Sequence, residues 1–330
     1  DAITTGAANT SLGYLALSAN TTASSNTAIG AFSLDANTTG GDNVSVGSAT
    51  LGANTEGASN TAVGVSALGA NTTASNNTAF GCQAALANTT GTPTTAFGYQ
   101  ALKANTTGTN NCAFGQGTLQ TNITGTTNSA FGTLALSANT GSGNSSVGYA
   151  SLLTNTSGAN NVAMGISSLR LNTTGASNTA IGTSALYSNT EAGDNTAVGY
   201  LAGVAVTTGA RNICIGALSG DGLTTGSNCI LIGKSATESA VGTSNQTVLG
   251  TDVTCVGDSN FTFGGGATDS NIAFGATSIT APSDQRYKEE ISDATAGLAF
   301  IKDLRPVTFK WKKEKDVPSD HPSYVEGSDT

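Results

Sequence analysis

Apolar and polar positions recur along most of this chain with a 17-residue period, as from Gly13 to Gly30. The unit has the form N-T-A-φ-G-x-x-A-L-x-x-N-T-T-G-x-x, where φ is a large apolar residue, and fifteen copies can be aligned on their glycine. The interval from Gly132 to Gly148 is one residue shorter than the others. The segment between Asn139 and Asn144 is one residue shorter than the corresponding segment in the other copies. The aligned structural-repeat glycines are Gly13, Gly30, Gly47, Gly64, Gly81, Gly98, Gly115, Gly132, Gly148, Gly165, Gly182, Gly199, Gly216, Gly233 and Gly250. A fixed period of this length is the signature of a stacked repeat architecture.

Four further positions of the unit have a defined character. The residue before the glycine is apolar in all fifteen copies, and we expect it to face a dry interior. Leucine stands four residues after the glycine in ten of the first eleven copies, which predicts a second inward row. Alanine, serine or cysteine lies two before the glycine in 13 copies, as expected where another backbone passes closely. Asparagine, which suits corners and can form stacked hydrogen-bonded rows, recurs four before and seven after the glycine.

These features predict an all-β fold, a β-solenoid or β-roll of 17-residue coils built from short strands and tight corners. Fifteen coils stacked at ~4.8 Å would span roughly 70 Å. Each coil supplies only two large apolar residues, so a wide core within one chain is not expected. We therefore favour several chains sharing one axis, as a parallel homotrimer.

The pattern predicts three segments. Residues 1–250 form the solenoid, although Val206 and Leu223 replace the second asparagine in late copies. Residues 251–282 form an irregular β neck, in which Phe261, Phe263, Phe274 and Ile279 alternate as in strands. Residues 283–330 form a small α+β segment that holds 18 charged side chains, against 15 in residues 1–280.

Composition excludes several function classes. The formal charge of −9 lacks the basic clusters that nucleic acid requires, and no apolar run is long enough for membrane insertion. No leader peptide is expected either. The spacing of the five cysteines is not that of a metal site, so we expect neither a bound metal nor a cofactor. We expect these cysteines to serve as small buried residues: Cys82, Cys112, Cys214, Cys229 and Cys255. The glycines recur with the period of the whole repeat, which is unlike a phosphate-binding loop.

The repeats resemble two kinds of fibrous protein. The N-T-A-I-G sequences at 26–30 and 178–182 are similar to the head repeats of trimeric autotransporter adhesins, although those heads use a shorter repeat. Long arrays of this sort also look like phage fibre shafts. The resemblance to the adhesin heads implies three parallel chains wound side by side.

A second resemblance begins at Ser283. The sequence S-D-Q-R-Y-K-E-E-I at 283–291 resembles the opening of the endosialidase-type intramolecular chaperone of phage tail spikes and fibres, and L-R-P-V-T-F-K-W-K at 304–312 resembles a later strand of that family. Helical spacing predicts a short helix over 293–303 between them. The resemblance implies that this segment trimerises the fibre and is released by self-cleavage at or beside the bond between Ser283 and Asp284. Ser283 would be the nucleophile and Lys288 the base.

The leading hypothesis is a virion tail or capsid fibre for host attachment, with no enzymatic activity in trans. Its expected partners are two further copies of the chain, other virion proteins and a host surface receptor, for which a glycan is one candidate. A bacterial trimeric adhesin on the cell surface is the alternative, and a membrane anchor after Thr330 would distinguish it. An ice-binding solenoid, with flat rows of exposed threonines, is a second alternative. Sequons such as those at Asn20 and Asn71 could carry glycans, although turn chemistry explains them equally well.

Overall fold

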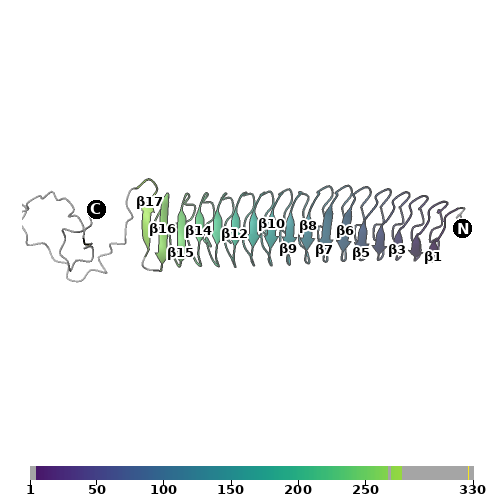
Figure 1. The fold of residues 1–330 in the computed structure, drawn as a ribbon, viewed down its shortest axis with the longest axis horizontal. Helices are drawn as coiled ribbons and strands as arrows, with labels where there is room; N and C mark the ends of the chain where they lie inside the picture. Colours follow the sequence, from purple (N-terminus) through teal and green to yellow (C-terminus); the bar gives the residue numbers. More distant parts are fainter. Residues whose placement is uncertain (1–4, 267–268, 277–325, 327–330) are drawn as a thin grey trace, which may run out of the picture. The chain divides into compact units, whose positions relative to one another are not determined.

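The computed structural model describes residues 5–266, 269–276 and 326 of the chain. Contacts divide the chain into two compact units, Asp1–Pro282 and Ser283–Thr330. The first unit is a β-solenoid of about fifteen 17-residue coils, with no helix among its described residues. The predicted fold class is confirmed. Figure 1 shows one short strand per coil, with the strands aligned side by side.

Each coil contributes one strand to a continuous sheet. The strands are β1 (Thr10–Leu12), β2 (Thr27–Ile29), β3 (Val44–Val46), β4 (Thr61–Val63), β5 (Thr78–Phe80), β6 (Thr94–Phe97), β7 (Asn111–Phe114), β8 (Ser129–Phe131), β9 (Ser145–Val147), β10 (Val162–Met164), β11 (Thr179–Ile181), β12 (Thr196–Val198), β13 (Ile213–Ile215), β14 (Ile230–Ile232), β15 (Thr247–Thr251), β16 (Asn260–Gly265) and β17 (Ser270–Ala273).

The strands from β1 to β16 pair in parallel, each with the strand of the next coil. Equivalent positions lie opposite one another, so that Ala62 of β4 pairs with Ala79 of β5. Ser129 pairs with Ser145, which shows that the corner between β8 and β9 absorbs the missing residue without disturbing the register. Backbone hydrogen bonds also join successive coils at the corners, such as Leu51 N to Ala67 O at 3.0 Å. Very short strands therefore suffice, because most of the perimeter is bonded to the next coil.

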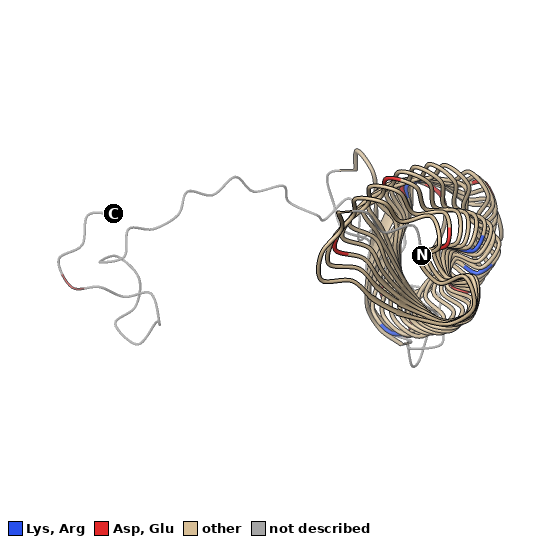
Figure 2. Cartoon of the chain, turned by 90° about the vertical axis from the view of Figure 1, so that its right-hand side faces the viewer, with Lys and Arg blue, Asp and Glu red and all other residues tan. Residues whose placement is uncertain are grey.

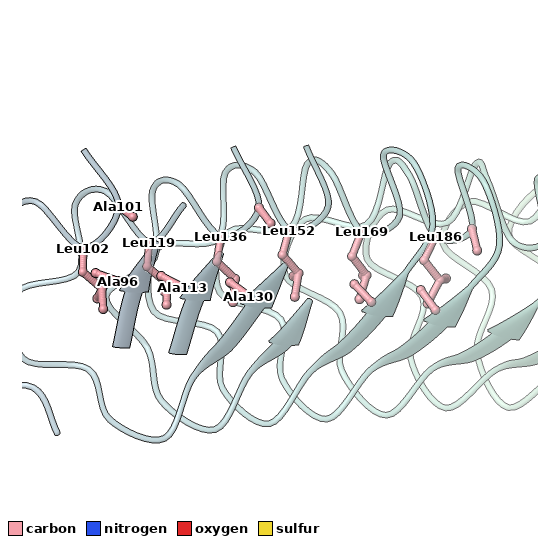
Figure 3. Packing of buried hydrophobic residues seen from close by; sticks show 14 of the residues in the cluster. Ala96, Ala101, Leu102, Ala113, Leu119, Ala130, Leu136, Leu152, Leu169 and Leu186 are labelled. Carbon is pink, nitrogen blue, oxygen red and sulfur yellow. The ribbon is translucent and has the colours of Figure 1, made fainter. Parts of the chain in front are cut away.

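The core consists mainly of two apolar rows that run along the stack, and the small residue before each leucine, such as Ala101, is buried beside them. One row is the leucine four residues after the glycine, and Leu102, Leu119 and Leu136 have no exposed surface. The other is the small residue in the middle of each strand, such as Ala113. Figure 3 shows leucines of successive coils, such as Leu102, Leu119 and Leu136, packed beside these alanines. The prediction of an inward leucine row is confirmed.

We expected the apolar residue before each glycine to face a dry interior, and within the core of the single chain this prediction is wrong. Ile29, Phe80 and Phe131 are each more than a third exposed, whereas Ala28 and Ala79 are fully buried. The reason is the alternation of a β-strand, in which neighbouring side chains point to opposite faces. A narrow coil already holds a leucine, so it has room on the strand side for alanine but not for a second large residue.

A single chain closes this core without help from another. Asparagines fill the space that the apolar residues leave, since Asn37, Asn54 and Asn105 are fully buried. The expectation that one chain could not line its own core is therefore wrong, because buried amides can fill a core when they are hydrogen-bonded. An axis shared by several chains is not needed to explain the fold of one coil.

The glycine of each unit marks the point where successive backbones come closest. At Gly98, φ is +137°, a conformation that other residues rarely adopt. A Cβ atom added there would lie 2.5 Å from the carbonyl oxygen of Gly115 in the next coil. Backbone conformation and lack of space both require glycine.

The stack of parallel strands continues beyond residue 250. Thr247 of β15 pairs with Phe261 of β16, so this coil is three residues shorter than the regular ones, and β17 then pairs antiparallel with β16. Ile279 lies outside the described residues.

Among the cysteines, Cys214, Cys229 and Cys255 are buried as expected, whereas Cys82 is exposed and Cys112 is partly exposed.

Candidate functional site: the outward strand face and the asparagine rows

The strands present a row of large apolar side chains on the outside of the solenoid. This outward row consists of the residue before each glycine: Leu12, Ile29, Val46, Val63, Phe80, Phe97, Phe114, Phe131, Val147, Met164, Ile181, Val198, Ile215, Ile232 and Leu249. Ten of the fifteen are exposed, from 36% at Ile29 to 67% at Leu12, and the rest are half-buried. The sequence shows the alternation of small and large residues behind this orientation, but the width of the coil decides which of the two faces the core. The small residue in mid-strand can pack closely against the core, and strand alternation then directs its neighbours outward.

Four phenylalanines form a continuous stack within the outward row. The ring centroids of Phe80 and Phe97 are 4.9 Å apart, and those of the next two pairs, Phe97–Phe114 and Phe114–Phe131, are 5.2 Å apart. The interplanar angles are 6° to 9°, so the rings lie nearly parallel. The spacing follows from the ~4.8 Å separation of neighbouring strands, which brings identical side chains into face-to-face contact.

The asparagines seven residues after the glycine form a hydrogen-bonded row inside the solenoid, the corner asparagine row: Asn20, Asn37, Asn54, Asn71, Asn88, Asn105, Asn122, Asn139, Asn155, Asn172 and Asn189. Within it, Asn105 Nδ2 donates to Asn88 Oδ1 at 2.8 Å and to Gly108 O at 3.0 Å. Asn105 Oδ1 in turn accepts from Asn122 Nδ2 at 2.9 Å. Each amide therefore closes its own corner and binds the amide of the neighbouring coil.

This row is interrupted where the repeat changes. Asn122 Oδ1 has no hydrogen-bond partner, because the shortened corner makes Asn139 Nδ2 donate to Gly141 O instead. Asn189 Oδ1 also has no partner, because Val206 occupies the next position of the row. Loss of one asparagine thus leaves a buried acceptor unpaired in the neighbouring coil.

A second row joins the start of each strand to the preceding coil. Asn26 Oδ1 accepts from the backbone N of Asn43 at 3.0 Å, and Asn26 Nδ2 donates to Gly40 O at 3.0 Å. Asn77 Nδ2 has no partner. The two asparagine positions of the unit are therefore structural: they hold the corners of neighbouring coils together.

The threonines and sequons beside these rows have internal partners. Asn20, Asn37, Asn71 and Asn88 all lie in sequons and are fully buried, so the folded stack offers no access for a glycan at these amides. The first threonine of the corner donates to the next coil, as Thr89 Oγ1 does to Thr106 O at 3.1 Å. This contact turns the hydroxyl donor away from water, which disfavours an ice-matching row at this position.

Titratable groups of the described residues are few, and none forms a catalytic arrangement. Burial raises the pKa of Cys214 to about 12, and burial raises the pKa of Glu238 above its ordinary value, with the nearby charge of Asp221 adding to it. In the part of the chain that the structure describes, no three His, Cys, Asp or Glu side chains are grouped so that they could hold a metal ion. The described residues also contain no helix of the length and hydropathy needed to cross a bilayer.

An apolar pocket of about 360 Å³ lies at the end of the parallel stack. It is lined by Thr247 of β15, Phe261 of β16, Ile272 and Ala273 of β17, and residues 274–276. No charged side chain contributes to its lining.

The residues predicted to carry self-cleavage lie outside the described residues. These are Ser283, Asp284 and Lys288, together with the helix expected over 293–303 and the strand within 304–312. Their roles stay predictions from the sequence.

Comparison with known proteins gives one result that bears on function. A comparison with curated proteins and one with solved structures each found no match. The family comparison gave a match that begins at the serine of the predicted cleavage motif and supports the chaperone part of the resemblance. Residues 283–324 match the model of the family described as chaperone of endosialidase.

Proposed function

We propose that this chain is the shaft of a homotrimeric virion fibre, followed by a chaperone segment that assembles the trimer and is then released by self-cleavage. The observation that carries the proposal is the chaperone match at 283–324, which directly follows a repetitive β-solenoid. The chaperone family implies trimeric assembly. A solenoid of uniform coils supplies length and stiffness, because each coil is bonded to the next around most of its perimeter.

The fibre would serve attachment of a virion to its host, in contact with other virion proteins and a surface receptor. The described residues favour a structural role. They present no grouped metal-binding side chains, and most of their buried asparagines hold neighbouring coils together.

Self-cleavage requires a nucleophile and a base in the chaperone segment. Ser283 is the proposed nucleophile and Lys288 the proposed base, and the cut falls at or beside the bond between Ser283 and Asp284. A lysine can act as a base near neutral pH when burial or neighbouring positive charge lowers its pKa.

Expression of the complete coding sequence, with mass measured under native and denaturing conditions, tests this function. We expect a native mass of three shafts and a fragment that ends near Ser283. The variants Ser283→Ala and Lys288→Ala should abolish the cut. The matched variants Ser292→Ala and Lys302→Ala, which change the same residue types outside the motif, should leave it intact. A monomeric, uncut product would overturn the proposal.

A further inference from the structure

The outward row is apolar without exception, although it is exposed in the single chain. The residue after the glycine provides a comparison within the same coils. It is exposed in most coils as well, yet it includes Ser48, Gln116, Thr183 and Lys234 beside tyrosines and valine. Exposure in this solenoid therefore does not by itself select apolar residues. The uniform apolarity of the outward row needs another cause.

Strand propensity does not supply that cause. The residue three before the glycine lies on the same outward face of each strand, and there threonine is frequent, as at Thr27, Thr61 and Thr179. Threonine favours strands as valine and isoleucine do. It nevertheless never occurs in the outward row. The row is therefore selected for apolar surface rather than for strand formation.

The outward face also carries no charge over its whole length. Neither of its two positions holds a charged residue in any of the fifteen coils. The charged side chains of the solenoid lie elsewhere on the coils, and Figure 2 shows how sparse they are. Absence of charge over a continuous surface is typical of the core of a protein–protein interface.

The size of this face matches a stable interface. Ten of these side chains are 36–67% exposed and the other five are half-buried, so at ~150–250 Å² for a large apolar side chain the row presents on the order of 800 Å² of apolar surface. A standard stable interface buries about 800 Å² per partner, whereas the largest apolar patch on a typical monomer is ~300–600 Å².

We propose that the outward row is the surface on which copies of this chain pack against one another, parallel and in register. This inference rests on the proposed fibre and names the face that builds it. The partner is a second copy of the chain, because its outward row has the same spacing of one large apolar residue per coil. Parallel in-register packing brings the four stacked phenylalanines of one copy against the same four of the next. An antiparallel arrangement would displace them, since they occupy the fifth to eighth of fifteen coils.

Paired charges on the complete chain test the face. In the variant Phe97→Glu/Phe114→Glu, two carboxylates per copy enter the proposed interface. The matched control Thr90→Glu/Thr107→Glu places the same charges at exposed corners of neighbouring coils. By native mass spectrometry of the shaft after release of the chaperone segment, we expect the first variant to fall from three chains to one at micromolar concentration and the control to remain at three. A trimer that persists in the first variant would contradict the proposal.

Disulfide cross-linking gives a second test that does not depend on tolerance of charge. In a background with Cys82→Ser and Cys112→Ser, Ile181→Cys on the outward row should link to its own counterpart under mild oxidation. Thr174→Cys, at an exposed corner, should not. The opposite result would place the interface elsewhere. If the unsubstituted chain is monomeric and uncut, the proposed function fails. If it is cut and trimeric but Ile181→Cys does not link, only the choice of face is wrong.

Discussion

The corner asparagine row allows the cost of an unpaired buried amide to be measured by comparing two identical substitutions. Asn105 lies inside the row and Asn189 at its end, and both side chains are fully buried. Asn105→Ala removes the partner of Asn88 Oδ1 and of Gly108 O, for each of which Asn105 is the side-chain donor. Two buried acceptors are left unpaired.

The same substitution at Asn189 has a smaller effect. It removes the donor to Asn172 Oδ1, but Ala192 O keeps a hydrogen bond from Asn178 Nδ2 at 2.8 Å. It also eliminates Asn189 Oδ1, which already has no partner. The number of unpaired buried acceptors therefore does not change.

The difference between the two variants is two unpaired acceptors. At ~1–3 kcal/mol for each, Asn105→Ala should be less stable than Asn189→Ala by about 2–6 kcal/mol. The loss of asparagine volume is common to both variants and cancels in the comparison. Because each coil contacts only its neighbours, the destabilisation should be local to the coils beside the substitution.

Hydrogen exchange followed by mass spectrometry suits this test, because it reports the opening free energy of individual coils. Peptides covering 88–122 in Asn105→Ala should exchange faster than in the unsubstituted chain, and by a larger factor than those covering 172–195 in Asn189→Ala. Equal acceleration in both variants would refute the reasoning, since it would mean that the inter-coil amide bonds contribute nothing beyond the packing of the side chain.

Two further predictions concern the glycine column and the thiols. Gly98→Ala should lower the thermal midpoint markedly, because a positive φ alone costs ~1–3 kcal/mol and the added Cβ would contact Gly115 O. Gly52→Ala should be tolerated, because Gly52 has an ordinary φ and looser surroundings. Thermal melts followed by circular dichroism compare the two variants, and equal midpoints would contradict the structural role of the repeat glycines. Iodoacetamide at pH 8 should label the exposed Cys82 and leave Cys214 unmodified in the native protein. Cys214 is buried, and its pKa of about 12 keeps the thiol protonated at that pH. Labelling of Cys214 before unfolding would show that reagent reaches the core at this coil.

The sequence by itself determined the repetitive part of this fold. The regular recurrence of glycine fixes the length of the coil, because the backbones of successive coils come closest at that residue. The leucine four residues later identifies a core row, and Asn54 or Asn105 could be assigned to corners from their turn chemistry alone. The chaperone motif at 283 was likewise visible in the sequence, because closely spaced charged and aromatic residues break with the repeat.

Tertiary structure decided which side of the strand faces the core. Hydrophobicity predicted that Phe80 would be buried and gave no reason to prefer Ala79, yet Ala79 is inside and Phe80 is outside. The width of the coil is the physical reason. Once a leucine from the opposite side fills the interior, only a small residue fits beneath the strand, and alternation places the large one outside. The distance between opposite walls of a coil depends on all of its corners, so no local pattern specifies it.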